Sequence, residues 1–367
     1  MTSVRTWGKR PGTVVQEAVP FNAEAAAAAL ADEEITPVDV FYARNHGPIP
    51  DVAANDWRLV VDGLVDAELD LSLDRLTSEF AEHEVTATLQ CAGNRRDEFV
   101  AIRPIPGEDP WGPGATSTAR WHGARLADVL ASAGVTDADD LHVEFTAPDV
   151  AADASPAQAY GSSIPLRKAL SREVLLAWRM NDEPLPRLHG GPVRVVVPGF
   201  IGARSVKWVH RITVRDSPSD NYFQASAYRL LPADADPGAG AGEGIPLSSI
   251  GLNSAILCPA DGAVLPPGPV TVSGYALGGD DREIARVDVS ADGGATWRPA
   301  ELSASRGPWA WRFWSFTVDL VDGTVDVVAR AWDDRGGLQS ESTAALWNPK
   351  GYANYSWPRR RIVVGRS

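Results

Sequence analysis

The stretch ARVDVSADGGATWRPAEL, residues 285–302, reads as two short strands joined by a tight turn. Apolar and polar residues alternate along it, as they do in strands with one buried face, and Asp-Gly supplies typical hairpin-turn residues. Further alternating runs surround it at regular spacing, at residues 270–278, 310–320, 325–334 and 343–348. These roughly 120 residues show no helical pattern and predict an all-β, immunoglobulin-like sandwich.

The residues that precede this sandwich predict a different architecture. Segment 36–45 reads as a helix because Thr36 and Pro37 form a start signal, and segment 125–134 reads as one because Gly134 is a stop signal. The alanine-rich run AEAAAAALADEE, residues 23–34, also reads as a helix. β-Branched or alternating runs predict strands at residues 85–91, 141–147, 193–199 and 206–214.

Irregularly interleaved helices and strands are typical of an α+β domain. We therefore expect an α+β domain over residues 1–245 and the sandwich over residues 246–367. The segment LLPADADPGAGAGEGIPLSS, residues 230–249, is rich in Pro, Gly and Ala without periodicity, and we interpret it as the linker or crossing segment between them.

Composition restricts the classes of partner. The net charge of −14 argues against nucleic acid and anionic membranes as binding partners. The sequence lacks an apolar run near the roughly 20 residues of a membrane-spanning helix, and the N-terminus does not resemble a signal peptide. With only two cysteines, Cys91 and Cys258, we expect a cytoplasmic protein without a disulfide framework.

The stretch TLQCAGNRRDEF, residues 88–99, places Cys91 close to Arg95 and Arg96. A buried structural thiol gains nothing from nearby cations, whereas a thiolate is stabilised by them. This pattern indicates a functional thiolate, and the alternative is a core cysteine at the end of a strand.

Two other stretches collect groups that bind anions. One is FYARNHGPIP, residues 41–50, and the other is LHGGPVRVVVPGFIGARSVKW, residues 188–208. Arginine next to an apolar strand tends to be buried and needs a partner, and Arg with Lys suits phosphate. In an acidic protein these stretches predict a bound polyanion, although each alone is compatible with a solvated surface turn. The groups concerned are Arg44, Asn45, His46, His189, Arg194, Arg204, Ser205 and Lys207.

Together with YGSSIPL, residues 160–166, and RVDVSADGGATW, residues 286–297, these motifs resemble the sulfite oxidase family of molybdenum-cofactor enzymes. The resemblance extends from about Pro20 to WNPKGY at residues 347–352. The layout is most similar to the short, plant-type form of the family, which lacks a haem domain. The resemblance implies a molybdopterin-binding domain followed by an immunoglobulin-like dimerisation domain, and therefore a homodimer. It also implies one molybdenum–molybdopterin per chain, no haem or flavin, and Cys91 as the only protein ligand of the metal.

The resemblance further assigns residues around the cofactor and the substrate. Arg44 and Arg96 would face the substrate oxyanion, Trp111 would wall the pocket, and Tyr228 matches the active-site tyrosine. Lys350 stands where the family usually has arginine, so the charge is kept but the planar fork is not. Cys258 matches nothing catalytic and is expected to be a buried structural thiol. The cofactor contacts carry over to Tyr42, Ala43, Arg44, Asn45, His46, Asp149, His189, Arg194, Ser205, Val206 and Lys207.

The implied activity is oxidation of sulfite to sulfate by oxygen-atom transfer. The electron acceptor stays open between oxygen, a cytochrome and a small redox protein. One alternative is nitrate or sulfoxide reduction on the same scaffold, and Lys350 favours the sulfite-type anion site over the first of these. Another is a non-catalytic assembly or binding protein, against which the cysteine and the cofactor motifs argue.

Overall fold

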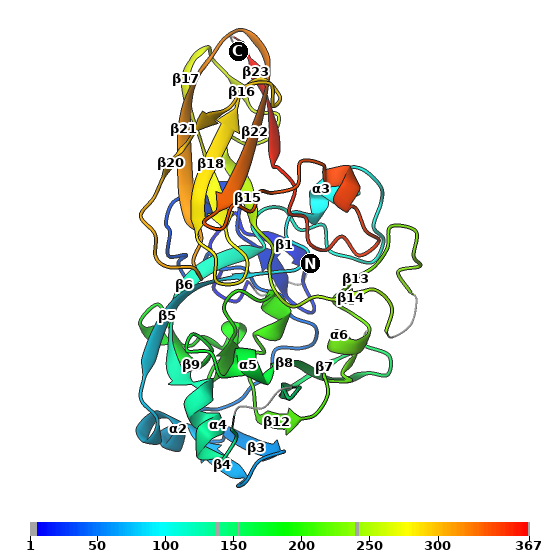
Figure 1. Cartoon of the computed structure of the whole chain (residues 1–367). Coiled ribbons are helices and arrows are strands. Elements are labelled where there is room, and N and C mark those ends of the chain that lie inside the picture. The colour runs from blue at the N-terminus through cyan, green and yellow to red at the C-terminus, as the bar shows by residue number, and fades with distance from the viewer. Residues whose placement is uncertain (1–5, 137–139, 153, 239–241, 366–367) are drawn as a thin grey trace.

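The computed structural model describes residues 6–136, 140–152, 154–238 and 242–365. They form a mixed N-terminal part, with two five-stranded sheets and short helices, and a C-terminal part made of two further sheets (Figure 1). The expected α+β architecture followed by an all-β sandwich is confirmed. Among the described residues, no helix is both long and apolar enough to cross a lipid bilayer.

The first sheet of the N-terminal part carries the cysteine at one strand end. Its order is β10-β9-β6-β5, β11 also pairs with β9, and all of its pairings are antiparallel. The strands predicted at residues 85–91 and 193–199 correspond to β5 and β11. The bounds are β5 (His83–Gln90), β6 (Thr116–Arg125), β9 (Leu175–Met180), β10 (Glu183–Pro184) and β11 (Arg194–Val196).

The second sheet has the order β4-β3-β12-β7-β8, with β12 parallel to β3 and antiparallel to β7. The strand predicted at residues 141–147 lies within β7. The strand predicted at residues 206–214 is shorter than expected, because Trp208 has a φ of 50° and the chain turns before β12 begins. The bounds are β3 (Arg58–Gly63), β4 (Leu69–Ser72), β7 (His142–Ala151), β8 (Gln158–Pro165) and β12 (Arg211–Arg215).

The described helices are all short. The helix predicted at residues 125–134 is confirmed as α4, and Gly134 follows it with a φ of 80°, which favours glycine. The alanine-rich run forms only α1, because its first residues belong to β2 (Asn22–Glu24), which pairs with β1 (Val14–Glu17). The bounds are α1 (Ala27–Leu30), α2 (Leu73–Glu79), α3 (Arg96–Val100), α4 (Leu126–Ser132), α5 (Leu166–Ala169), α6 (Tyr222–Ala225) and α7 (Thr343–Leu346), with 3-10 turns η1 (Arg187–His189) and η2 (Gly202–Arg204).

The helix predicted at residues 36–45 is wrong. The Thr36 N–H donates to the Thr118 carbonyl at 2.8 Å, and the Thr36 hydroxyl accepts from the Thr118 N–H at 3.1 Å. The hydroxyl is therefore used by the neighbouring strand β6 and does not cap a helix. The Phe41 N–H donates to the Pro37 carbonyl and closes a single turn, and Ala43 then pairs with Ala23 in a β-bridge.

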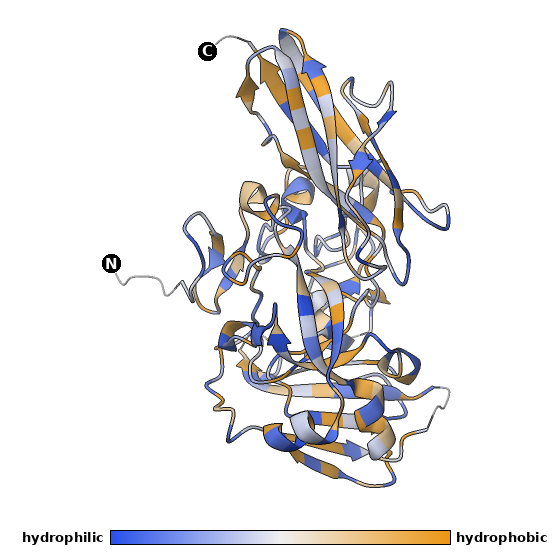
Figure 2. Cartoon of the chain, turned by 90° about the vertical axis from the view of Figure 1, so that its left-hand side faces the viewer, coloured by the Kyte–Doolittle hydropathy of each residue, from blue (hydrophilic) through white to orange (hydrophobic). Residues whose placement is uncertain are grey.

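The C-terminal part is a sandwich of two sheets, with the orders β15-β17-β21-β20 and β16-β23-β22-β18-β19. Hydrophobic and hydrophilic residues alternate along its long strands (Figure 2), and Val287, Val327 and Ile362 are completely buried between the sheets. The bounds are β15 (Asn253–Cys258), β16 (Val264–Leu265), β17 (Gly268–Leu277), β18 (Ile284–Ser290), β19 (Arg298–Pro299), β20 (Glu301–Leu302), β21 (Arg312–Leu320), β22 (Gly323–Asp333) and β23 (Arg359–Val364).

The hairpin predicted at residues 285–302 is confirmed. Strands β18 and β19 pair in antiparallel register, and the turn between them contains Gly293 and Gly294 with positive φ. The strand predicted at residues 343–348 is wrong, because Ser342 accepts a hydrogen bond from the Ala345 N–H and caps α7.

The segment 230–249 is held against the N-terminal part and is not a free linker. Within its described residues, β14 (Ile245–Pro246) pairs back onto β13 (Arg229–Leu230). The Leu247 N–H then donates to the Tyr228 carbonyl, and the Ile201 N–H donates to the Ser248 carbonyl. These hydrogen bonds hold the backbone of Tyr228, a predicted active-site residue, in place before the sandwich begins.

Arg95 joins the two parts. Its side chain is completely buried, and its Nη1 donates to the carbonyls of Ser254 and Ser356 at 2.8 Å each. Its Nε and Nη2 donate to the Glu98 carboxylate at 2.9 and 2.6 Å. A buried charge is tolerated only when it is paired and fully hydrogen-bonded. The segment after Cys91 is therefore locked to strand β15 and to the C-terminal segment.

We predict that Arg95→Met lowers the free energy of unfolding by about 3–5 kcal/mol, because it removes the main cation from the partly buried Glu98 carboxylate and a charged donor from two carbonyls. Urea unfolding followed by circular dichroism measures the change. Arg75→Met is the matched control, since Arg75 forms an exposed ion pair with Glu79 on α2, and its effect should be much smaller. Equal effects of the two substitutions would show that Arg95 does not hold the parts together.

Candidate cofactor and active site

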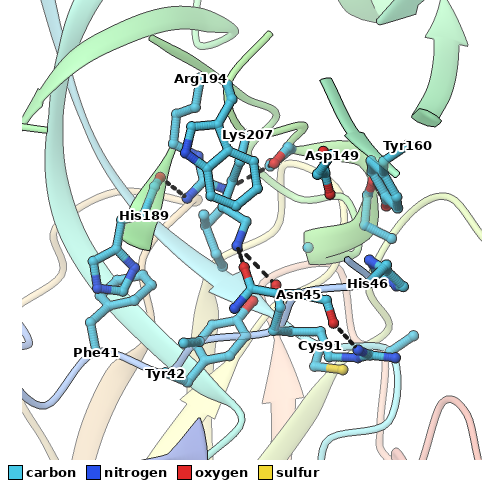
Figure 3. A pocket seen from close by; sticks show the side chains of 18 of the residues that line it. Phe41, Tyr42, Asn45, His46, Cys91, Asp149, Tyr160, His189, Arg194 and Lys207 are labelled. Atoms are coloured by element: carbon cyan, nitrogen blue, oxygen red, sulfur yellow. Dashed lines mark hydrogen bonds between the residues drawn. The ribbon is translucent and has the colours of Figure 1, made fainter. Parts of the chain in front are cut away.

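A hollow in the N-terminal part brings together most of the predicted cofactor residues. It encloses about 650 Å³, counting the part that is open to solvent, and its walls come from segments far apart in the sequence (Figure 3). The predicted residues that line it are Tyr42, Ala43, Arg44, Asn45, His46, Cys91, Asp149, His189, Arg194, Ser205, Lys207 and Tyr228.

Four residues that the resemblance assigned to the cofactor or the substrate lie outside the lining of this hollow: Trp111, Val206, Arg96 and Lys350. Trp111 is 1% exposed and packs in the hydrophobic cluster that also contains Cys91. Val206 is buried in the main core, and its carbonyl accepts from the Val195 N–H at 2.8 Å. Its contribution is therefore to hold the neighbouring residues in place.

Cys91 follows the end of β5 and begins a tight turn. Its N–H donates to the Ala115 carbonyl and its own carbonyl accepts from the Asn94 N–H, while the side chain is free and buried. Burial raises the pKa of the Cys91 thiol, and the nearby Arg96 and Arg44 lower it. The net shift is upward, so the cations alone do not produce the thiolate that the sequence pattern indicated. Coordination of a metal ion would remove the thiol proton.

Basic groups gather on the other side of the hollow. Lys207 reaches toward Asn45 and donates to its side-chain oxygen and, at 3.0 Å, to the Arg44 carbonyl (Figure 3). Arg194 donates to the carbonyls of His189 and Ser205 at 2.9 and 2.8 Å. Among the described residues, neither Lys207 nor Arg194 has a carboxylate within ion-pair distance.

Lys9 belongs to the same cluster although it lies near the N-terminus. Its ammonium donates to the carbonyls of Val38 and Phe41 at 2.6 and 2.5 Å and contacts His189 Nε2 at 2.9 Å. Burial lowers the pKa of Lys9 to about 7. Burial, then Lys9, Lys207 and Arg194, lower the pKa of His189 well below its usual value. Several buried basic groups without an anionic partner are the arrangement expected around a phosphate.

Asp149 supplies an unused acceptor in the same hollow. It is 5% exposed, and its Oδ1 has no hydrogen-bond partner among the described residues. Burial raises the pKa of Asp149 to about 6, and Lys207 opposes this shift. A buried carboxylate oxygen without a donor is uncommon and suits a ligand that carries N–H groups. The donor set therefore fits the predicted cofactor, a pterin with a phosphate and a thiolate-bound metal.

A cluster of aromatic side chains closes the hollow near Arg44. The His46 Nε2 and Tyr228 Oη atoms lie 2.6 Å apart, and Tyr160 stacks on His46 with ring centroids separated by 4.6 Å. Burial, then Arg44 and Lys207, hold the pKa of His46 well below its usual value. Burial raises the pKa of Tyr228, and Arg44 opposes this shift. Both groups are therefore neutral near pH 7 and share one hydrogen bond.

Arg96 and Lys350 lie just beyond this cluster. The Arg96 guanidinium packs against the turn after Cys91, since a Cβ added at Gly93 would lie 2.5 Å from its Nη2. It also lies 5.2 Å from the Tyr352 ring, which in turn stacks on Tyr228 at 5.4 Å. Arg96 therefore contacts Tyr352, which stacks on Tyr228, and its Nε donates to the Lys350 carbonyl at 3.0 Å.

Sequence reasoning missed three contributors. Tyr160 begins the YGSSIPL motif, so the motif itself marked it. Lys9 is one of only four lysines in the chain, and that scarcity was its only signal. Gly202 packs against Tyr42, since a Cβ at Gly202 would lie 2.6 Å from the Tyr42 hydroxyl. No sequence pattern predicts such a contact.

Two other predictions need correction. Arg204 was grouped with the anion-binding residues, but its guanidinium donates to the carbonyls of Leu247 and Phe223, so it braces the core. Cys258 was expected to be buried, but it is only partly buried at the end of β15.

Comparisons with known proteins agree with this geometry. Residues 46–223 match the family described as "Oxidoreductase molybdopterin binding domain", and residues 246–365 match the "Mo-co oxidoreductase dimerisation domain". The chain is 44% identical to the sulfite oxidase of Gallus gallus, over 96% of this chain and 78% of that protein. It is 38% identical to the sulfite oxidase of Arabidopsis thaliana, over 98% and 96%.

A solved structure is also similar. The sulfane dehydrogenase SoxCD from Paracoccus pantotrophus superposes with a TM-score of 0.79 at 27% identity, over 95% of this chain and 85% of that one. Against several longer mammalian relatives, the chain spans 66% of their length.

The substitution Lys9→Met, made in protein prepared without cofactor, tests whether burial of the Lys9 ammonium costs stability. The pKa of Lys9 falls from 10.5 to about 7 on folding, so between these values the unfolded chain binds a proton that the folded chain does not. The free energy of unfolding should therefore rise with pH over this range in the wild type, relative to the variant. Urea unfolding at about pH 7 and about pH 9.5 measures the difference. Parallel pH profiles would contradict it.

Proposed function

The chain belongs to the sulfite oxidase family of molybdopterin-binding oxidoreductases, and we propose that it oxidises sulfite to sulfate at a molybdenum centre. The observation that carries the proposal is one buried, free thiol beside a hollow whose basic groups have no ion-pair partner among the described residues and whose Asp149 has one oxygen without a donor. Membership of the family supports the reaction class. The side chains that line the hollow support the assignment of the residues that would hold the cofactor.

Cys91 would bind the metal, since a thiolate suits a soft metal centre. The basic cluster of His189, Arg194 and Lys207 would hold the cofactor phosphate, with Lys9 behind His189. Asp149 would accept hydrogen bonds from pterin N–H groups through its unpartnered oxygen. The predicted contacts that complete this set are Tyr42, Ala43, Arg44, Asn45, His46 and Ser205, with Val206 behind them in the core.

When bound, the cofactor supplies oxygen-atom transfer, so that sulfite gains an oxygen derived from water and releases two electrons to an acceptor. The chain must first collect a small anion against its own net charge of −14. Arg44, Arg96 and Lys350 offer preorganised cations for this purpose. The Tyr228 hydroxyl, bonded to His46, can hold or pass a proton beside the substrate, and Trp111 excludes water behind Cys91.

The finer parts of the proposal concern partners. We propose that residues 246–365 form a homodimer, on the basis of the dimerisation-family match. Oxygen, a cytochrome and a small redox protein are the candidate electron acceptors, and no haem or flavin is needed within this chain. A cytoplasmic location is part of the same proposal.

We predict about one molybdenum per chain, lost in Cys91→Ser and retained in Cys258→Ser. The reason is that Cys91 lies beside the hollow, whereas Cys258 lies on β15 of the sandwich. Elemental analysis of the two purified variants, which carry the same chemical change, measures the difference. Equal molybdenum loss in both, or full sulfite turnover by Cys91→Ser, would defeat the assignment.

The substrate is tested by steady-state turnover of the wild-type holoenzyme. Sulfite with several acceptors should be oxidised far faster than nitrate or a sulfoxide is reduced. Turnover of nitrate or sulfoxide alone, with molybdenum present, would assign the site to the alternative reaction on the same scaffold.

A further inference from the structure

Glu108 lies between the two outer cations of the site. Its Oε2 is 3.2 Å from Arg96 Nη2, and its Oε1 is 3.3 Å from Lys350 Nζ. One carboxylate thus spans both cations, with one oxygen on each. It is the only carboxylate within ion-pair distance of either cation among the described residues.

The other two nitrogens of the Arg96 guanidinium each donate to a backbone carbonyl. Its Nε donates to the Lys350 carbonyl at 3.0 Å, and its Nη1 donates to the Asp109 carbonyl at 2.7 Å. These bonds hold the guanidinium and the chain around Lys350 in one place. Nη2 and the Lys350 ammonium are the two groups that meet the Glu108 carboxylate. The pair is therefore a preformed receptor for two oxygen atoms.

Glu108 can leave this receptor without a backbone change. Its side chain is 18% exposed, so water can reach the carboxylate. The backbone that follows it is anchored, because the Asp109 carbonyl accepts from Arg96 and the Trp111 carbonyl accepts from the Asp97 N–H at 3.1 Å. Rotation about the side-chain bonds of Glu108 is then enough to expose both cations.

From this arrangement we propose that Glu108 is a resident anion that substrate must displace from Arg96 and Lys350, and that it thereby sets the affinity of the site for oxyanions. The inference rests on the proposed function, in which these cations bind the substrate oxyanion. An oxyanion with two negative charges competes with a carboxylate better than one with a single charge, because each cation gains more from it. Glu108 thereby raises the affinity that any anion needs to occupy the two cations, a threshold that a doubly charged sulfur oxyanion passes more readily than nitrate or chloride.

Glu108→Gln keeps the shape of the side chain and removes its charge. In the purified holoenzyme, we expect the Kd of sulfate, a non-reacting anion, to fall by about tenfold, the order of one charge-assisted contact. The KM for sulfite should fall more than any change in kcat. Nitrate binding should gain by a similar factor to sulfate binding, because both anions must displace the same carboxylate. Calorimetric titration measures the binding, and steady-state rates measure the kinetics.

Glu68→Gln is the matched control, because Glu68 is exposed and its substitution makes the same change in net charge. It should leave the Kd of sulfate unchanged. A tenfold fall in both variants would mean that net charge alone is responsible and would overturn the inference. Unchanged or weaker sulfate binding in Glu108→Gln would overturn it too, by showing that Glu108 only positions Arg96.

A double-mutant cycle isolates the competition. Lys350→Ala should weaken sulfate binding more in the Glu108→Gln background than in the wild type, because Glu108 no longer occupies the lysine. Equal effects would contradict the proposal. Glu108→Ala replaces Glu108→Gln if the latter does not fold. Sulfate binding is measured without turnover, so a holoenzyme that failed to oxidise sulfite would defeat the proposed function and leave this test intact.

Discussion

The buried guanidinium of Arg95 is the constraint on which the site depends. It holds the turn after Cys91 against two carbonyls of the C-terminal part, and Asn354 donates back to the Arg95 carbonyl at 2.9 Å. A buried cation cannot release its partners without a large loss of free energy. Neither the predicted metal ligand nor Arg96, which follows Arg95 directly, can move independently of the sandwich. The sandwich is therefore part of the active site as well as the proposed dimerisation surface.

Charge is distributed around this anchor in an unusual way for an acidic protein. Basic groups without carboxylate partners line the inner side of the hollow, and burial with mutual repulsion lowers their pKa values. The outer cations, by contrast, are bridged by a carboxylate from the chain itself. We infer that the inner group is built for a permanently bound anion and the outer group for one that exchanges.

Sequence patterns predicted the regular elements better than the irregular ones. Alternating runs such as residues 325–334 became strands because one face of each is buried in the sandwich. The capping signal at Thr36 failed because strand β6 uses the same hydroxyl, and the run at residues 343–348 formed α7 outside the sheets. In both places a tertiary contact or a local cap overrode a pattern that carries only local information.

The sequence by itself determined the family, the order of the two folds, Cys91 as the candidate ligand and most of the residues that line the hollow. It could do so because each of these residues sits in a short motif with its own neighbours. Only the tertiary structure decided that Lys9 meets His189, that Arg95 bonds the sandwich and that Glu108 spans Arg96 and Lys350. Lys9 and His189 are 180 positions apart, and Glu108 and Lys350 are 242 apart. The folded chain alone brings such distant charges together.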